Sequence, residues 1–313
     1  MAEARMADPP AGFVFTLGPE DANATLAAAL RRHLPNRSWA DVRRLCESGK
    51  ILLDGQRALD AATRIAGGQR VEIRMAAPRP RAEIPDFSVV FEDPHLMVIE
   101  KPAGISSVPF DRKETGTAMD LIREAWRRAG RKATATPIYI VHRLDKDTSG
   151  LLCFARTKLA ERRLHVVFQQ HLAEREYLAV AHGAIESRRI ESVLVADRGD
   201  GLRGSTRTGR GQRSVTHVTA LQALRGATSC RVRLETGRTH QIRIHLSEAG
   251  HPLVGETVYI RERLASDAPI FRSPRLMLHA ATLGFDHPVT GERLDFRAEP
   301  PADFQAVLEG LTR

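Results

Sequence analysis

The spacing of apolar residues predicts a chain rich in short strands with a few amphipathic helices. Apolar runs of strand length recur after residue 88, and turn-forming residues separate them. These runs cover 89–91, 96–99, 137–141, 151–155, 176–181, 215–219, 230–234, 276–283 and 294–296. Strands outnumber the crossover helices that a parallel sheet needs. We therefore predict an α+β fold with a mixed, largely antiparallel sheet rather than a doubly wound one.

Capping residues and helical periodicity place the helices of this region. Thr117 and Thr157 each precede an apolar stretch of helical period, so we expect both to be N-caps. Trp126 in the first helix is expected in the core rather than as a platform for a base. The apolar face predicted for the second helix consists of Leu164, Val167, Phe168 and Leu172. Residues 241–246 fit either a strand or a short helix.

A smaller domain is predicted before residue 78. After a helical pattern over 24–33, Ser38 can cap a second helix, because Asp41 stands in capping-box position and Gly49 follows the helix end. Strands at 50–53 and 70–73 follow.

The segments on either side of this domain differ from it in composition. Residues 1–12, rich in Ala, Pro and charge, predict a flexible tail. The alternating prolines of 78–86 predict a linker, because they favour extended backbone. The expected domains are therefore 13–77 and 87–313.

Composition indicates a polyanionic partner without identifying it. In 313 residues, 47 Lys and Arg exceed 38 Asp and Glu, for a net charge of +9. Cys46, Cys153 and Cys230 lie far apart, which argues against a disulfide framework, a zinc knuckle or a redox pair. No signal-peptide pattern and no apolar run near the roughly 20 residues of a membrane helix occurs, so we expect a cytoplasmic protein without a membrane partner.

Charged residues crowd the link between the runs 137–141 and 151–155. Asp145 and Asp147 stand there beside Arg143 and Lys146. Burying a carboxylate costs several kcal/mol unless a partner compensates it, so this loop is a candidate functional site. A solvated connector with incidental ion pairs is the alternative.

Residues 198–213 form a second unusual segment. They contain five arginines and five glycines, with Leu202 as the single large aliphatic residue. This composition predicts either a mobile arm that closes on phosphates or a disordered loop.

Five motifs in the same order resemble those of the RluA-type pseudouridine synthases, which isomerise uridine in RNA. The central one is His142-Arg143-Leu144-Asp145 followed by Thr148-Ser149-Gly150. The others are Glu92-Asp93 through Lys101-Pro102-Ala103-Gly104, Arg175-Glu176-Tyr177, Thr236 through His245, and Leu278-His279-Ala280 with His287-Pro288.

The resemblance implies roles for three residues. Asp145 would be the essential carboxylate, acting as nucleophile or as base toward the ribose; the spacing Leu-Asp-x-x-Thr-Ser-Gly fits it and not Asp147. Arg243 would pair with Asp145 through its planar fork. Tyr177 would stack on the target uracil and assist proton transfer at carbon five. Glu256, where this family usually has Asp, and Ile260, where it usually has Gly, depart from the pattern.

Further residues are implied to bind RNA. Arg143 would fill the space left by a flipped nucleotide, Arg238 would hold phosphates with the 198–213 segment, and His240 would be a hydrogen-bonding residue of the arginine motif rather than a metal ligand. The domain over 13–77 resembles the alpha-L RNA-binding module. The residues expected to bind RNA in it are Arg37, Arg43, Arg44 and Lys50.

This module departs from its family at Thr25-Leu26-Ala27 and at Gly68-Gln69. A small domain whose arginines are merely solvated is therefore the alternative.

The chemistry implied by the resemblance requires no cofactor, and the sequence offers no phosphate loop and no convincing metal set. The expected partner is RNA, with large-subunit ribosomal RNA preferred over transfer RNA, and the expected state is a monomer. Two alternatives remain at this stage: a non-catalytic RNA-binding or ribosome-assembly factor, and an aspartate-dependent nucleoside hydrolase.

Overall fold

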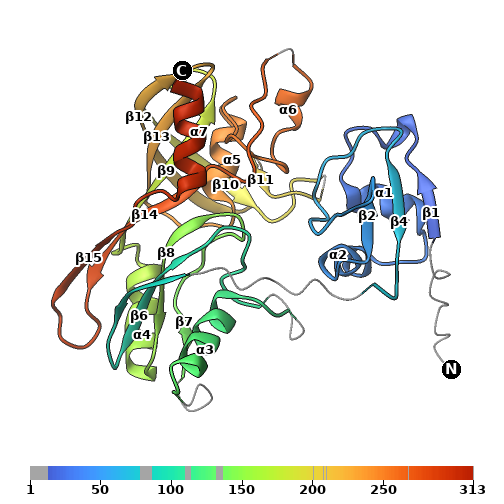
Figure 1. Ribbon diagram of the computed structural model, residues 1–313. Coiled ribbons are helices and arrows are strands. Elements are labelled where there is room, and N and C mark those ends of the chain that lie inside the picture. The colour runs from blue at the N-terminus through green and yellow to red at the C-terminus, as the bar shows by residue number, and fades with distance from the viewer. Residues whose placement is uncertain are drawn as a thin grey trace. The chain divides into compact units, whose positions relative to one another are not determined.

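The computed structural model divides into two compact units, Met1–Ala82 and Glu83–Arg313 (Figure 1). It describes residues 13–77, 87–109, 114–131, 137–199, 201–206, 208, 210–266 and 268–312. The tail predicted over 1–12 and the linker predicted over 78–86 lie outside these residues.

The N-terminal unit contains a 4-stranded antiparallel sheet in the order β1-β4-β2-β3. Its elements are β1 (Phe13–Thr16), η1 (Pro19–Asp21), α1 (Leu26–His33), α2 (Trp39–Glu47), β2 (Ile51–Leu53), β3 (Gln56–Arg57) and β4 (Arg70–Ile73). The predicted capping box is confirmed: the Asp41 N–H donates to Ser38 Oγ at 3.1 Å, and the Ser38 N–H donates to Asp41 Oδ2 at 3.2 Å. Strand β1, which pairs with β4, is an element beyond those predicted.

The C-terminal unit is built on an 11-stranded sheet in its described part. Its strands are β5 (Ser88–Glu92), β6 (Leu96–Lys101), β7 (Tyr139–Ile140), β8 (Ser149–Ala155), β9 (Glu174–His182), β10 (Arg188–Val195), β11 (Gly204–Ser205), β12 (Gln212–Leu224), β13 (Ala227–Leu234), β14 (Leu278–Asp286) and β15 (Arg293–Arg297). Its helices are α3 (Ala118–Arg128), α4 (Lys158–Gln169), α5 (Gln241–Glu248), α6 (Arg261–Leu264) and α7 (Ala302–Thr312).

The predicted α+β class with a mixed, largely antiparallel sheet is confirmed. The path through the sheet is β11-β10-β12-β13-β9-β14-β8-β6-β5, with β15 beside β14 and β7 beside β8. Strands β8 and β14 pair in parallel, whereas the other described pairs of this sheet are antiparallel.

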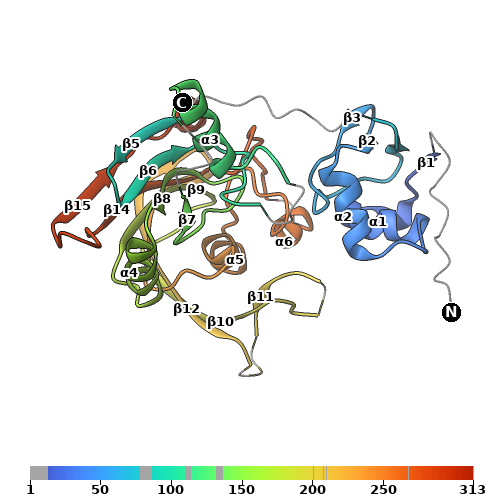
Figure 2. The same ribbon diagram turned by 90° about the horizontal axis from the view of Figure 1, so that it is seen from below.

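The helices cover both faces of this sheet. Residues of α3 and α5 share one apolar core with Tyr177 and Ala179 of β9, and Trp126 lies in that core as predicted, 4% exposed. Helix α4 packs on the other face, against β8 and β14. Figure 2 shows α4 and α5 on opposite sides of the strands. The functional motifs therefore converge on the face that carries α5.

Several local predictions were wrong in their limits. The run 137–141 contributes just Tyr139–Ile140 as a strand. Of the two alternatives given for residues 241–246, the short helix is the one that forms. Helix α4 ends at Gln169, so Leu172 is 61% exposed instead of lying on its apolar face. Helix α7 was not predicted, although Phe304, Val307, Leu308 and Leu311 have helical spacing.

The glycine-rich segment is partly ordered into the sheet. Strand β11 pairs with the end of β10, and the Ser205 N–H donates to Glu248 Oε1 of α5 at 2.9 Å. The alternative of a disordered loop is therefore wrong for Gly204–Ser205, because backbone pairing and the Glu248 carboxylate hold these residues where apolar side chains are lacking.

Gly150 allows the parallel pairing of β8 with β14. Its φ is +111°, and a Cβ at this position would lie 2.2 Å from the carbonyl oxygen of Ala280. A side chain cannot fit there without separating the two strands. Beside it, Ser149 Oγ and His279 Nδ1 lie 2.9 Å apart. The Ser-Gly pair of the central motif thus joins two strands distant in sequence.

Candidate active site

The charged loop between β7 and β8 starts at His142, which is half-buried. The Cys153 N–H donates to His142 Nε2 at 2.9 Å, and the imidazole stacks on Phe168 with 4.2 Å between ring centroids. Burial lowers the pKa of His142 to about 3, so the ring is neutral at pH 7 and Nε2 can accept this bond. His142 therefore anchors the loop to β8 and is not available for proton transfer.

Two side chains from outside the loop hold its middle. Ser107 Oγ donates to the Leu144 carbonyl at 2.8 Å and accepts from the Leu144 N–H at 3.0 Å. Lys101 Nζ donates to the Lys146 carbonyl at 3.0 Å. Asp145 lies between these two anchored residues, so its backbone position is fixed on both sides. The roles of Ser107 and Lys101 were not predicted, because the contacts join segments about 40 residues apart in the chain.

Asp145 faces a guanidinium and an imidazole. Arg243 Nη1 lies 3.9 Å from Oδ2, and His240 Nε2 lies 3.9 Å from Oδ1. The Asp145 side chain is 18% exposed, whereas that of Arg243 is 7% exposed. A carboxylate that is reachable from solvent and flanked by two nitrogen donors is suited to act on a bound substrate.

The planar fork of Arg243 binds Glu256. The prediction that this fork pairs with Asp145 is therefore corrected. Arg243 Nε donates to Glu256 Oε2 at 2.8 Å and Nη2 donates to Oε1 at 2.7 Å. Backbone N–H groups of Val258 and Tyr259 also donate to Oε1. Burial opposes ionisation, yet Arg243 and these N–H groups hold the pKa of Glu256 below its usual value. Glu256 is a stronger partner than Asp145, because it is fully buried and bonded at two points, and it leaves Arg243 Nη1 to face the loop.

Tyr259 holds His240 in a comparable way. The phenol oxygen lies 2.8 Å from His240 Nδ1, and the Arg243 guanidinium lies over the Tyr259 ring, 5.4 Å from its centroid. When the Tyr259 hydroxyl donates to Nδ1, the imidazole proton is on Nε2, the nitrogen that faces Asp145. The segment 256–259 therefore orients both side chains beside Asp145. The sequence marked Glu256 as a family departure, but it carried no sign of the role of Tyr259.

Tyr177 lies on the same face of the sheet as the loop. It is 8% exposed and packs in the core that includes Leu144 and Ile242. Burial raises the pKa of Tyr177, so the phenol is protonated at pH 7. Arg143 is exposed, and it forms no hydrogen bond or ion pair with the described residues.

A pocket of about 290 Å³ lies beside the arginine motif. Its described lining is Leu194, Val195, Ala196, Arg203, Gly211, Gln212, Arg238, Thr239 and Ile244. The predicted phosphate ligand Arg238 thus shares a concave surface with Arg203 of the glycine-rich segment.

The basic residues predicted to bind RNA in the N-terminal unit differ in their surroundings. Arg43 is exposed on α2 and Arg37 is half-buried just before it. Arg44 pairs with Asp41 on the same helix, and Lys50 Nζ donates to the carbonyl of Ala77. The Lys50 ammonium is therefore directed at its own unit.

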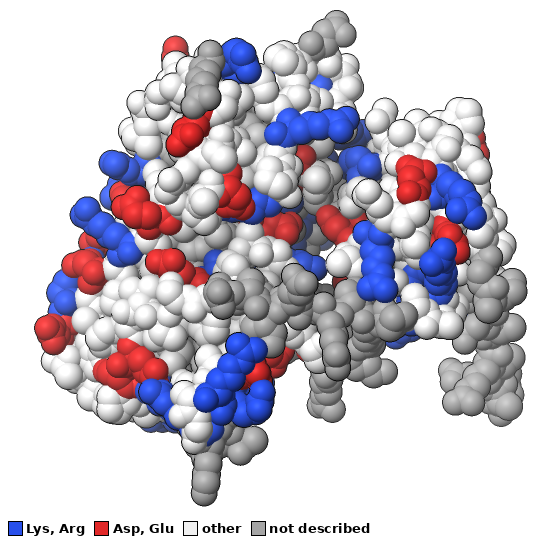
Figure 3. Space-filling model, viewed as in Figure 1, with Lys and Arg blue, Asp and Glu red and all other residues white. Residues whose placement is uncertain are grey.

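His245, the second histidine of the arginine motif, is hydrogen-bonded within the fold. His245 bonds the hydroxyls of Thr216 and Ser192, at 2.8 and 3.0 Å. All three cysteines are buried thiols, as expected. No helix among the described residues is long and apolar enough to span a bilayer. On the face drawn in Figure 3, Lys and Arg are interspersed with Asp and Glu rather than gathered into one patch.

Comparison with known proteins identifies the family of this chain. Residues 95–248 match the family model described as RNA pseudouridylate synthase. A "Ribosomal large subunit pseudouridine synthase D" from Zymomonas mobilis subsp. mobilis is 36% identical over 307 residues, or 95% of this chain and 96% of the relative. A protein of the same name from Xanthomonas campestris pv. campestris is 35% identical and covers 91% of this chain and 88% of the relative.

Solved structures share the fold. Human RNA Pseudouridylate Synthase Domain Containing 4 matches with a TM-score of 0.57 at 24% identity, over 72% of this chain and 92% of that one.

Proposed function

Because this chain belongs to the RNA pseudouridine synthase family, we propose that it isomerises uridine in large-subunit ribosomal RNA and that Asp145 is its essential carboxylate. The enzyme class follows from the family. The RNA target, the role of each residue and the flipping of the base are the proposal.

The position of Asp145 is the observation that carries this assignment. The reaction breaks the bond between uracil N1 and the ribose, turns the base and rejoins it through carbon five, with no net redox change. A carboxylate serves either as nucleophile at the sugar or as base toward the ribose, and both roles require an ionised and oriented group. The position of Asp145 suits this role, since Arg243 Nη1 and His240 Nε2 each lie 3.9 Å from one of its carboxylate oxygens.

The target uridine must leave its helix to reach Asp145. Extruding a nucleotide costs a few kcal/mol, and a side chain that occupies the vacated space offsets part of this cost. Arg143 is suited to this role because it is exposed, two residues from Asp145, and without a bonding partner in the described chain. Tyr177, buried on the same face, would then stack on the extruded uracil.

The relatives named for the large ribosomal subunit support ribosomal RNA as the substrate. The net charge of +9 suits any RNA and does not favour one.

The test is to map pseudouridines in ribosomal and transfer RNA from cells with and without this gene. We expect a site in large-subunit RNA to disappear with the gene and to return with the wild-type protein. Asp145→Asn should fail to restore it, because the amide is neither an anion nor a base. Asp147→Asn, which changes the neighbouring carboxylate of the same loop, is the matched control and should restore the site.

Three results would contradict the proposal. Restoration by Asp145→Asn would remove the catalytic role of Asp145, and loss of a site in transfer RNA alone would replace the substrate. Unchanged pseudouridines in both RNAs would remove the proposed target altogether.

A further inference from the structure

Buried side-chain nitrogen atoms without hydrogen-bond acceptors lie beside the active site. Arg175 is 9% exposed, and its Nε and Nη2 are buried with no hydrogen-bond partner among the described residues. Arg238 Nε and His171 Nδ1 are in the same condition. No described carboxylate lies within ion-pair distance of either arginine, although the unit contains many surface ion pairs. We call Arg175, Arg238 and His171 the arginine cluster.

The members of the arginine cluster lie near one another. A Cβ added to Gly237, the residue before Arg238, would be 2.6 Å from Arg175 Nη1, so the Arg175 guanidinium rests against this backbone. Burial lowers the pKa of His171, and the charges of Arg175 and Arg238 lower it further, which places both charges near that ring.

The arginine cluster also adjoins the reacting groups. Arg175 is two residues before Tyr177 on β9, so both side chains are on one face of the sheet. Burial raises the pKa of Tyr177, and the charges of Arg175 and Asp145 act on it in opposite directions. The cluster is therefore on the Tyr177 side of the site, whereas Glu256 is behind Arg243.

A structural role does not account for this arrangement. A buried charge is costly unless a partner and hydrogen bonds compensate it. Leaving a buried donor without an acceptor is also destabilising, and more so for a charged group. A buried, unpaired charge that destabilises the free protein is typical of a ligand-binding site.

We propose that the arginine cluster binds a backbone phosphate of the substrate RNA next to the flipped uridine. The inference rests on the proposed function for the identity of the RNA, but the anion site can be tested without it. Two guanidinium groups offer parallel N–H donors, and a phosphodiester offers two unesterified oxygens that match them. A phosphate bound here would fix the backbone beside Tyr177 while the base turns.

The first experiment measures stability and phosphate binding in the free enzyme. Arg175→Met removes the charge while retaining most of the apolar volume, so its denaturation midpoint without phosphate should equal or exceed that of wild type. Inorganic phosphate should raise the wild-type melting temperature beyond the effect of sodium chloride at equal ionic strength. The extra shift should disappear in Arg175→Met and in Arg238→Gln.

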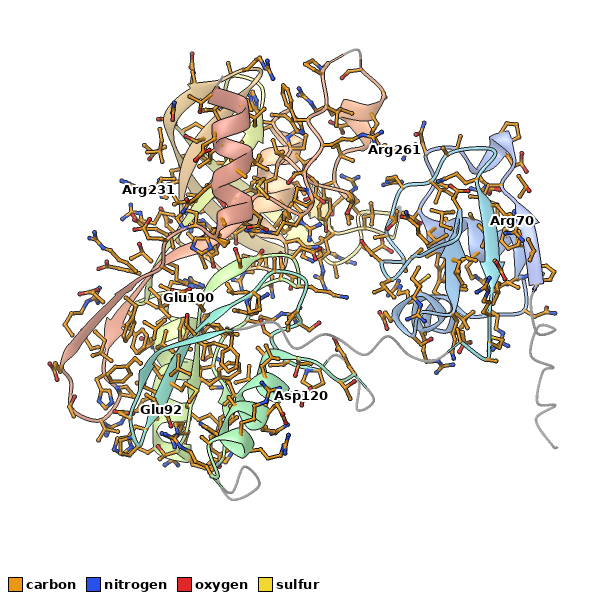
Figure 4. All side chains as sticks on the ribbon, viewed as in Figure 1. Arg70, Glu92, Glu100, Asp120, Arg231 and Arg261 are labelled. Atoms are coloured by element: carbon orange, nitrogen blue, oxygen red, sulfur yellow. The ribbon has the colours of Figure 1, made fainter. Side chains whose placement is uncertain are left out.

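The matched control is Arg231→Gln. Arg231, labelled in Figure 4, projects from β13 on the opposite face of the sheet and has an exposed side chain. Its removal lowers the net charge equally, so it should leave the phosphate shift intact. Gly237→Ala is a second probe, because its methyl group would displace the Arg175 guanidinium and should also reduce the shift.

The second experiment measures the salt dependence of RNA binding. The probe is protein-free ribosomal RNA from cells that lack the gene. The slope of log affinity against log salt should decrease by about 1 in Arg175→Met and in Arg238→Gln, and by less in Arg231→Gln.

Each outcome decides the proposal. A less stable Arg175→Met protein with an unchanged phosphate shift would show a structural arginine and overturn it. A lost phosphate shift with an unchanged RNA slope would show a site for a free anion and overturn the RNA assignment. If phosphate results hold while ribosomal RNA is not modified, the proposed target fails and the anion site stands.

Discussion

Arg243 and Arg175 are both buried on the same side of one sheet, but their surroundings are opposite. Arg243 has a complete set of partners, with its fork on the buried carboxylate of Glu256. Arg175 has no acceptor among the described residues. The first region is closed, because its guanidinium is paired with a buried carboxylate, whereas the second carries a guanidinium charge that no described carboxylate pairs.

This difference separates two uses of a buried arginine. A paired one fixes geometry, because the partner and the surrounding hydrogen bonds determine where its remaining donor points. An unpaired arginine lowers the stability of the free protein, and a bound anion restores that stability. Burial alone therefore does not tell the two apart; the presence of a partner does.

The largest effect should come from breaking the closed region. Glu256→Gln leaves Arg243 buried without its counter-charge, so we expect a loss of about 3–5 kcal/mol in the free energy of unfolding. Chemical denaturation measures it, and Glu256→Asp, which retains the charge, should lose less. Wild-type stability in Glu256→Gln would remove the distinction between the two regions.

Arg243→Lys tests the same region by activity. Lysine keeps the charge but cannot hold Glu256 with a fork and still present a donor to Asp145. We expect the single-turnover rate to fall roughly 1,000-fold while the protein remains folded. A near-normal rate would show that the fork does not orient the catalytic group.

Tyr177→Phe tests the open region beside Arg175. The ring is retained, so RNA affinity should stay close to wild type. Loss of the hydroxyl should slow release of the carbon-five proton by roughly 100-fold, the lower end of the effect of general acid–base catalysis. Release of tritium from carbon five measures this step, and an unchanged rate would leave Tyr177 with stacking alone.

Lys101 provides an intermediate case, which can be tested by the dependence of stability on pH. Its ammonium donates to three backbone carbonyls, of Pro102, Ile105 and Lys146, and no carboxylate of the described residues is in hydrogen-bond contact with it. Burial lowers the pKa of Lys101 to about 7, against about 10.4 in an unfolded chain. Between these values the unfolded state binds more protons, so this residue should make stability rise with pH.

Lys101→Met should lack that rise. The measurement is the free energy of unfolding from pH 6 to pH 10 for both proteins, compared by slope. Equal slopes would show that Lys101 is not deprotonated in the folded protein. The comparison of Lys101 with Arg175, as a buried cation without a carboxylate partner, would then fail.

Local features were well predicted from the sequence because short-range chemistry determines them. Ser38, Thr117 and Thr157 cap helices, since a hydroxyl three residues before a free N–H needs no tertiary contact. The pattern of apolar and polar residues predicted most strands, and the excess of strands over helices predicted the largely antiparallel sheet. Strand β10 was not predicted, because its start is charged and half-exposed and lacks the apolar alternation of a core strand.

The site was predicted less completely. The motifs identified Asp145, Arg243 and Tyr177, and the structure brings these three to one face. The sequence could not assign the Arg243 fork to Glu256 or the Tyr259 hydroxyl to His240, because both contacts depend on how the segment after α5 folds back. Arg175 is unpaired because no described acceptor lies beside its guanidinium, and no sequence pattern encodes such an absence.

The contact of Gly150 with Ala280 makes the C-terminal part of the chain a support for the catalytic loop. Ala280 O would be 2.2 Å from any Cβ at 150, and Asp145 is five residues upstream. Displacement of β14 would therefore be transmitted to the carboxylate through a few bonds of stiff backbone. Insertions or truncations after residue 276 should impair chemistry even though they leave every proposed RNA ligand in place.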